Sequence, residues 1–360
     1  MDALILTYTS ALRVIRHARC ASVPLGDPVL SRREQCGIVE AAVCNGSLVD
    51  VDYLARLGLP EPTESVPLHV LVGCRSAHRH APCCVEHMVS PQRLPDSALV
   101  HLAGNVYCTS PIYTAFRYLN GRGLGEAFVL LSELLGTYSL SAEITEYLEC
   151  CDMMPDGCLE NSAVFGTEPV VAKREIALLA KKTKSRADAA FVRVAGCIAG
   201  PCASPMESIL LAMLGLPKRY GGFGCFSLPG GLHPNYRIDF DENARRMSSG
   251  IPYAVCDIYV PSARVDIEYN GSYHEGGHAW THDAARNNGL RGMGIKTLQV
   301  CADQMTDLVA LEAFAKNLYK ESGKRFVYAC DGYRIRQENL LAELYRATGL
   351  RFHWGARGVK

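Results

Sequence analysis

Two acidic side chains in one short stretch have the spacing to share a metal ion. Asp257 lies in a β-branched and aromatic run, residues 253–260, that stops at the turn residues 261–263. The next run, 264–269, alternates apolar and polar residues, which predicts a second strand with Glu268 on its polar face, across from Asp257. Two carboxylates that meet on neighbouring strands repel each other unless a cation holds them. We therefore expect Asp257 and Glu268 to bind one Mg²⁺ or Mn²⁺.

The residues after this hairpin add groups that could act on a substrate held by the metal. His274 titrates near neutral pH. A helix is predicted to follow, with Thr281 as its N-cap, and it places Asp283 and Arg286 three positions apart on one face. An alternating strand over 295–300 comes next. The elements that position the site are thus expected in the order strand, strand, helix, strand.

This ordered pattern resembles the PD-(D/E)XK nuclease superfamily and, within it, the bacterial branch related to very-short-patch-repair endonucleases. In that branch a Glu-x-x-Gly-x-x-His run replaces the usual Glu-x-Lys, and this chain has such a run from Glu268 to His274. Upstream, a helix beginning at Ser204 looks like the first core helix of the branch, and its acidic residue would be Glu207. The resemblance covers roughly residues 204–307.

The resemblance implies a restriction-endonuclease-like domain with a mixed central sheet flanked by helices. It implies a hydrolase, an endonuclease that cleaves DNA with Mg²⁺ or Mn²⁺ in a bacterial defence or repair context. The catalytic set that it implies is Glu207, Asp257, Glu268, Asn270, His274, Asp283 and Arg286. Asp257 and Glu268 would hold the metal, and His274 would act as general acid or base. Asp283 and Arg286 would orient His274 and a phosphate, respectively.

One of these positions departs from the superfamily. Asn270 stands where lysine is usual, so the charge of the transition state would have to be stabilised by another group, such as His274 or Arg286. This departure supports an alternative function. The chain could be a catalytically inactive nuclease-fold protein that binds DNA or acts as an antitoxin-like regulator.

Several of the candidates also have a purely structural interpretation. Acidic residues on alternating strands often face solvent. Glu207 follows Ser204 and a proline, so an N-cap and the helix dipole already explain an acid there. Asp283 and Arg286 could be a surface helical pair worth about 0.3–0.5 kcal/mol. The sequence leaves these alternatives open.

The first part of the chain is predicted to be a smaller α+β domain. A strand is expected over 68–72, a weaker one over 99–106, and a helix after Thr109-Ser110-Pro111. Residues 109–115 give a weak resemblance to abortive-infection-type antitoxins. We therefore expect an antitoxin-like or winged-helix-containing domain over 1–150, a linker with a basic helix over 151–203, and the nuclease-like domain over 204–360. A protein partner would bind through the N-terminal domain.

Composition limits the remaining possibilities. A chain of 360 residues favours two domains. Its 37 basic and 37 acidic residues exclude a strongly cationic packaging protein but not a nuclease. Residues 173–193 carry seven basic and two acidic side chains. The residues predicted to contact nucleic-acid phosphates are Lys181, Lys182, Lys184 and Arg186. The alternative for this run is a solvated helix face.

Cysteine usage and hydropathy indicate the compartment. The 16 cysteines include no Cys-x-x-Cys pair, so we expect free thiols in a reducing, cytoplasmic setting. A zinc site is the alternative for one dense group, Cys74, His78, His80, Cys83, Cys84 and His87. No segment approaches the ~20 apolar residues of a membrane span, so no membrane partner is expected. Past residue 300 we predict a helix over 301–319, a strand over 326–329 and a helix over 337–348.

Overall fold

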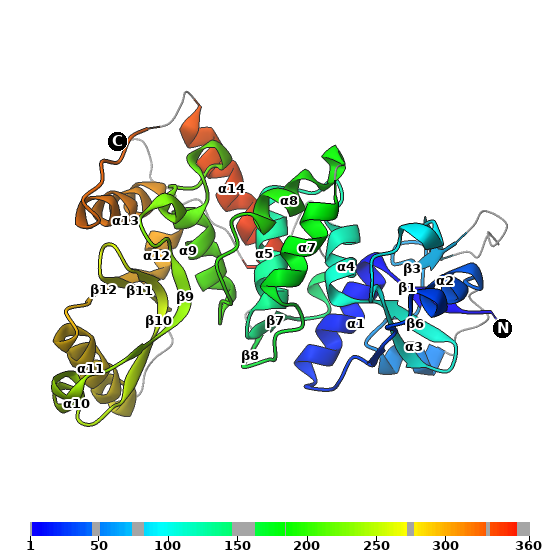
Figure 1. The fold of residues 1–360 in the computed structure, drawn as a ribbon, viewed down its shortest axis with the longest axis horizontal. Helices are drawn as coiled ribbons and strands as arrows, with labels where there is room; N and C mark the ends of the chain where they lie inside the picture. The colour runs from blue at the N-terminus through cyan, green and yellow to red at the C-terminus, as the bar shows by residue number, and fades with distance from the viewer. Residues whose placement is uncertain are drawn as a thin grey trace. The chain divides into compact units, whose positions relative to one another are not determined.

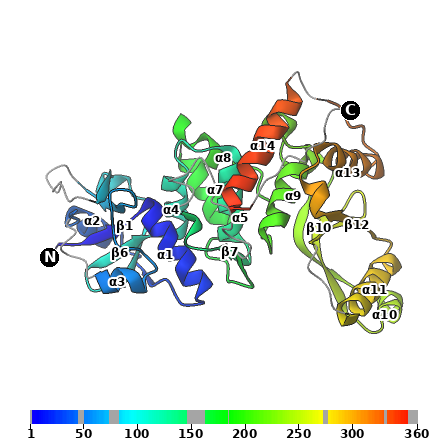
Figure 2. The same cartoon turned by 180° about the vertical axis from the view of Figure 1, so that it is seen from behind.

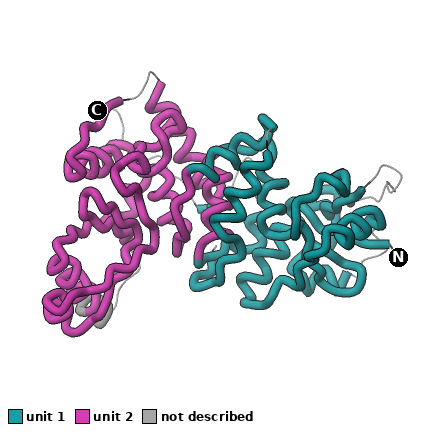
Figure 3. Tube along the Cα trace, in the orientation of Figure 1, with its two compact units in different colours: residues 1–123, 137–196, 348–350 teal, residues 124–136, 197–347, 351–360 magenta. Residues whose placement is uncertain are grey.

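The computed structural model describes residues 2–44, 51–73, 83–145, 163–183, 185–271, 277–328 and 332–350. The chain divides into two compact units (Figure 3). Unit 1 draws on residues 1–123, 137–196 and 348–350, and unit 2 on residues 124–136, 197–347 and 351–360. Each unit combines helices with a sheet of mixed strand direction, so the mixed α/β class expected from the sequence is present in both.

The main sheet of unit 1 has six strands (Figure 1). Their order is β2 (Asp27–Pro28), β5 (Leu99–Ala103), β6 (Val106–Thr109), β1 (Leu4–Leu6), β3 (Leu68–Val72) and β4 (Cys84–Met88). The β1–β6 and β3–β4 pairs are parallel, and the other pairs are antiparallel. The single strand expected over 99–106 is instead a hairpin, because Gly104 takes a left-handed conformation, φ +54°, in the turn between β5 and β6.

Apolar residues of the central strand β1 pack into hydrophobic clusters on both faces of this sheet, because successive residues of a strand point to opposite faces. Ile5 packs into one hydrophobic cluster with Ile38 of α2, while Leu4 and Leu6 pack into another with Val14 of α1. The helices of unit 1 are α1 (Tyr8–Cys20), α2 (Arg32–Glu40), α3 (Val51–Arg56), α4 (Pro111–Tyr118), α7 (Lys173–Lys182) and α8 (Ala189–Ala195). A two-stranded sheet, β7 (Tyr138–Leu140) with β8 (Ala163–Phe165), completes the unit.

The sheet of unit 2 has four strands. Figure 1 labels them, and Figure 2 shows this part of the chain from behind. Their order is β12 (Lys296–Cys301), β11 (Val265–Asn270), β10 (Tyr253–Val260) and β9 (His233–Asp239). The hairpin of β10 and β11 and the parallel strand β12 are confirmed, and α11 (Gly277–Gly292) connects β11 to β12. The edge strand β9 and helix α10 (Glu242–Met247), which packs on α11, were not predicted.

The remaining helices of unit 2 are α5 (Leu124–Leu135), α9 (Pro205–Gly215), α12 (Ala302–Met305), α13 (Leu308–Glu321) and α14 (Tyr333–Thr348). Helix α9 begins where the sequence predicts, because Ser204 Oγ accepts a hydrogen bond from Glu207 N at 3.1 Å and Pro205 occupies the first turn. Across the described residues, no helix combines the length and the apolar character that a membrane crossing needs.

Three local predictions in unit 2 are wrong. Helix α11 begins at Gly277, so Thr281 lies inside the helix and is not its N-cap. The helix expected over 301–319 is two helices, because the Asp307 side chain accepts a hydrogen bond from Val309 N and starts α13 afresh. Residues 326–328 form no strand: Phe326 packs edge-on against Tyr319 instead.

The unit boundaries also differ from the expected domains. Helix α5, which we placed in the N-terminal domain, belongs to unit 2. It packs on α9, and its Gly125 N donates a hydrogen bond to Glu343 Oε2 of α14 at 2.8 Å. The basic helix α7, expected in a linker, belongs to unit 1. After residue 136 the chain stays in unit 1 up to Gly196 and continues in unit 2 from Cys197 to Ala347.

Candidate functional site

Asp257 and Glu268 meet where the β10–β11 ladder ends. Backbone pairing runs through Val260–Val265, Tyr259–Asp266 and Ile258–Ile267. One residue further, the two carboxylates take the place of backbone acceptors. Asp257 N lies 3.4 Å from Glu268 Oε1, and Tyr269 N donates to Asp257 Oδ2 at 2.9 Å. The alternation of β11 thus places Glu268 opposite Asp257, as the sequence predicts.

A third carboxylate, which sequence reasoning missed, lies beside this pair. Asp266 is fully buried, although it is two residues from Glu268 on the same face of β11. Its Oδ2 atom lies 3.3 Å from Arg286 Nη2, and its Oδ1 atom has no hydrogen-bond partner in the described protein. The signal was available, because the alternation that selected Glu268 also selects Asp266. An unpaired buried carboxylate oxygen is costly unless a ligand or proton satisfies it.

Arg286 of α11 is the cation of this cluster. Its Nη2 atom lies 2.5 Å from Glu268 Oε1 and donates to the carbonyl oxygen of Val255 at 2.5 Å. Together with the Asp266 contact, these bonds hold the guanidinium on protein groups, with the side chain only 16% exposed. The resemblance implied that Arg286 would orient a phosphate. In this structure its partners are carboxylates and a carbonyl oxygen, and a contact with a phosphate stays a prediction.

Glu207 approaches the cluster from the first turn of α9. Its Oε2 atom accepts a hydrogen bond from Ala203 N at 2.8 Å, while Ser204 Oγ accepts from Glu207 N, so Ser204 caps the helix and Glu207 binds the backbone just before the cap. The structural role considered for Glu207 is therefore real. Its charge nevertheless reaches the hairpin, because it helps to raise the pKa of Asp257.

The carboxyl groups of the cluster have raised pKa values, because they are buried and lie close to one another. Burial is the largest cause that raises the pKa of Asp257, followed by the charges of Glu268 and Glu207. Burial and then the charge of Glu268 raise the pKa of Asp266, and burial also raises the pKa of Glu207. In the described part of the chain, four carboxylates thus lie near one arginine. The site would gain free energy from a proton or from an added cation.

The other predicted catalytic residues have no described contact with the acidic cluster. Asn270 is exposed at the end of β11, and Asp283 is exposed on α11. His274 lies outside the described residues, so its relation to Asp283 and Glu268 stays a prediction. The structure therefore brings together four residues of the expected set: Glu207, Asp257, Glu268 and Arg286.

The residues predicted to bind nucleic acid lie in unit 1. Lys181 and Lys182 are exposed at the end of α7, and Arg186 is exposed in the short 3-10 helix that follows. Lys182 Nζ lies 3.6 Å from Asp96 Oδ2, a contact between two exposed groups. Lys184 lies outside the described residues. These positions suit either phosphate contacts or a solvated face.

Two places were expected to bind a metal ion: the group of cysteines and histidines between Cys74 and His87, and the β10–β11 hairpin. Among the described residues, no three histidine, cysteine, aspartate or glutamate side chains are arranged to hold an ion as they lie. Of the possible zinc ligands, Cys74, His78 and His80 lie outside the described residues, and His87 pairs with His69. At the hairpin, the oxygen donors, the negative excess and the unpartnered Asp266 Oδ1 suit a hard cation. Asp257 and Glu268 would hold it once Glu268 released Arg286.

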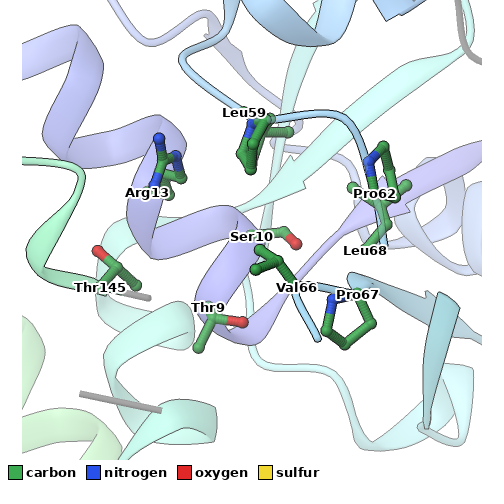
Figure 4. Close-up of a pocket in the computed structure, with 10 residues that line it drawn as sticks. Thr9, Ser10, Arg13, Leu59, Pro62, Val66, Pro67, Leu68 and Thr145 are labelled. Carbon is green, nitrogen blue, oxygen red and sulfur yellow. The ribbon is translucent and has the colours of Figure 1, made fainter. Parts of the chain in front are cut away.

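The pocket drawn in Figure 4 does not coincide with this site. It lies in unit 1, against the start of α1. Its walls are mostly proline and aliphatic side chains, among them Leu59, Pro62 and Pro67. None of the predicted catalytic residues lines it, so the chemistry is argued from the hairpin alone.

Comparison of the chain with protein-family models, with curated proteins and with solved structures finds no match. The geometry of the described residues is therefore the basis for any functional proposal.

Proposed function

We propose that unit 2 is a metal-dependent endonuclease domain that hydrolyses phosphodiester bonds in DNA, in bacterial defence or repair. The observation that carries the proposal is the meeting of Asp257 and Glu268 at the end of the β10–β11 ladder, beside the buried Asp266. A cluster of acids without an equal number of cations is unfavourable for folding alone. A bound Mg²⁺ or Mn²⁺ would compensate for it.

The residues of the cluster have distinct parts in this mechanism. Asp257 and Glu268 would bind the cation, which supplies Lewis-acid polarisation of a phosphate and a water of lowered pKa. Because its pKa is raised, Asp257 would give up a proton from its carboxyl group as the cation binds. Arg286 would keep its contact with Asp266 when Glu268 turns to the cation. His274, as the resemblance implies, would exchange a proton with the attacking water.

The alternative is a nuclease-fold protein that binds DNA or a protein partner without cleaving. Two observations favour it: Arg286 already neutralises Glu268, and Asn270 stands in place of lysine. The two functions differ in one requirement. A working site must bind a divalent cation at Asp257 and Glu268, whereas an inert scaffold needs none.

Cleavage of DNA by a Glu268→Gln variant tests the proposal. The substitution keeps the side chain's shape and removes an anionic ligand, so the rate with Mg²⁺ or Mn²⁺ should fall by at least about 100-fold. The measurement is the conversion of supercoiled plasmid to nicked and linear forms by the full chain.

A matched control is available in the same unit. Glu321 forms a surface ion pair with Lys296 at 2.8 Å, so Glu321→Gln removes an equal charge far from the hairpin in sequence and should leave the rate unchanged. Equal cleavage by wild type and Glu268→Gln would place the active site elsewhere. No cleavage by wild type under any of these conditions would favour the inert scaffold.

A further inference from the structure

A second cluster of titratable side chains lies in unit 1 and takes no part in the proposed nuclease site. His69 of β3 and His87 of β4 sit on neighbouring parallel strands. Their Nδ1 and Nε2 atoms, respectively, are 2.8 Å apart, and the Tyr8 ring stacks on both imidazoles with centroids 5.1 and 4.9 Å away. Both histidines are half-buried, so the pair is not sealed in the core.

The aromatic wall of this cluster is held by Arg122. Its Nη2 atom donates to Tyr8 Oη at 3.0 Å, and its Nε atom donates to the carbonyl oxygen of Tyr118 at 2.9 Å. The guanidinium carbon lies 3.9 Å from the centroid of the Tyr118 ring and 5.6 Å from that of Tyr8. Tyr8 itself has φ 53°, a left-handed conformation that a tyrosine adopts only at a cost. The position of this ring therefore comes with backbone strain at Tyr8.

The short contact between the imidazoles fixes how many protons the pair holds. Two protonated rings would place N–H groups against each other at 2.8 Å, so one nitrogen of the contact must be an acceptor. With both rings neutral, the pair shares one proton across the contact. It then presents one N–H and one lone pair at the two remaining nitrogens, His69 Nε2 and His87 Nδ1.

The charges around the pair are positive. Burial lowers the pKa of each histidine to about 4, helped by Arg122 at His69, and by His69 and Arg117 at His87. Around the pair, Tyr8 of α1 stacks on both rings, Tyr118 of α4 packs against Tyr8, and Arg122 lies just after α4. Arg117 of α4 is near enough for its charge to lower the pKa of His87. Within the described part of the chain, no carboxylate forms an ion pair with Arg117. An anion bound at Arg117 would supply the counter-charge that this side chain lacks among the described residues.

We propose that His69, His87 and Arg117 form a binding site for a phosphate-class anion, with Arg122 and the Tyr8 ring as its rigid support. A phosphate would accept from Arg117 and from the outward N–H of the pair, and it would stabilise an imidazolium at the other outward nitrogen. Binding therefore takes up a proton. The site and the nuclease proposal are independent, because no residue is common to both.

Titration of the full chain with inorganic phosphate, followed by NMR of the imidazole carbon-bound protons, tests this site. Saturable shifts should appear at the signals that His69→Gln and His87→Gln remove. Phosphate should raise the pKa of at least one of these histidines from about 4 to about 5, so it should bind several times more tightly at about pH 4 than at about pH 6, where both rings stay neutral. A second arm uses a short oligonucleotide in place of inorganic phosphate, to tell a nucleic-acid phosphate from a free one.

The matched variants are Arg117→Met and Arg56→Met. Arg56 also lies over a tyrosine ring of unit 1, that of Tyr53 at 5.5 Å, but outside the cluster. Arg117→Met should weaken phosphate binding at least tenfold, and Arg56→Met should leave it unchanged. The proposal is overturned if neither probe shifts the His69 and His87 signals of the wild-type chain, or if both variants bind equally well. The wild-type titration decides the question even where a variant does not fold.

Discussion

The acidic cluster of unit 2 and the histidine cluster of unit 1 are opposite in charge but alike in construction. Each places titratable side chains on neighbouring strands and adds an arginine from a helix or from the residues next to one. Burial is the largest influence in both, and it raises the pKa of Asp257 but lowers that of His69. In unit 2 the arginine neutralises the acids in part, whereas in unit 1 Arg117 and Arg122 add to the charge that the histidines would carry.

This difference indicates which ligand each unit would accept. Burying ionisable groups without partners of opposite charge makes the folded state less stable, and folding does not require such groups to be buried. A ligand of the right sign recovers that free energy when it binds. The comparison therefore predicts a cation at Asp257 and Glu268 and an anion at His69 and His87.

The largest stability effect is expected from removing the only arginine bonded to the acidic cluster among the described residues. Arg286→Met leaves Glu268 and Asp266 without a counter-ion, so unfolding free energy at about pH 8 should fall by about 3–5 kcal/mol. At about pH 5 the loss should be smaller, because the carboxyls take up protons. Urea unfolding at the two pH values measures both.

The control for this variant is Arg237→Met. Arg237 and Asp239 form an ion pair at 2.8 Å with both side chains more than half exposed, so its loss should cost no more than about 1 kcal/mol. If Arg286→Met cost the same at both pH values, its contacts would matter for packing rather than for charge, and the comparison between the two clusters would fail.

The next effect is an opposite pH dependence in the two units. The folded-state pKa of Asp266 is raised, so its contribution to stability is complete below the ordinary aspartate pKa of about 4 and is lost as pH rises through the folded value. The folded-state pKa of His87 is lowered, so its contribution is complete above about 6.5 and is lost as pH falls towards about 4. Lowering the pKa of His87 from 6.5 to about 4 corresponds to about 3 kcal/mol.

Hydrogen exchange followed by mass spectrometry separates the two units. Peptides from β10 and β11 should exchange faster at high pH, after correction for intrinsic rates, and peptides from β3 and β4 should exchange faster at low pH. Asp266→Asn should weaken the first dependence, to which Asp257 also contributes, and His87→Gln should weaken the second, to which His69 also contributes. The same direction of change in both units would contradict the comparison.

A smaller effect separates the two roles of Glu207. Glu207→Ala removes the acceptor for Ala203 N and should cost about 1 kcal/mol, whereas Glu207→Gln keeps that acceptor and removes only the charge. If the charge serves the acidic cluster, Glu207→Gln should lower the pKa of Asp257 and weaken divalent-cation binding at nearly unchanged stability. Identical cation binding by wild type and Glu207→Gln would reduce Glu207 to a helix cap.

The smallest effect concerns the exposed lysines of unit 1. Replacing Lys181, Lys182 and Lys184 together by alanine should flatten the dependence of log affinity for DNA on log salt by up to about three units of slope, without altering sequence preference. Stability should not change, because Lys181 and Lys182 are exposed. An unchanged salt slope would assign the run to a solvated face.

Local patterns were sufficient to predict most of the elements around the acidic site. Period-two alternation located β10 and β11, and Ser204 with Pro205 located the start of α9. The pattern failed where tertiary packing decides. Strand β9 has no continuous apolar run, because it is an edge strand with three exposed residues, and it forms by pairing with β10.

The contents of the two sites were predictable to different degrees. Glu268 and Asp257 followed from alternation, and Asp266 could have followed from the same rule. The partners of Arg286 could not be predicted. Helix periodicity shows which face of α11 carries Arg286, but it does not show which strand that face packs against. The pairing of His69 with His87 depends on the β3–β4 register, which a sequence with 11 histidines does not specify.

The most direct test of the nuclease proposal is calorimetric titration of the full chain with Mn²⁺ at about pH 7, in two buffers of different ionisation enthalpy. The account predicts saturable binding with release of protons, because the raised pKa of Asp257 keeps part of that carboxyl protonated before the cation arrives. Glu268→Gln should weaken the binding at least tenfold. Absence of binding by wild type, or equal binding by Glu268→Gln, would contradict the claim that this hairpin is a metal site.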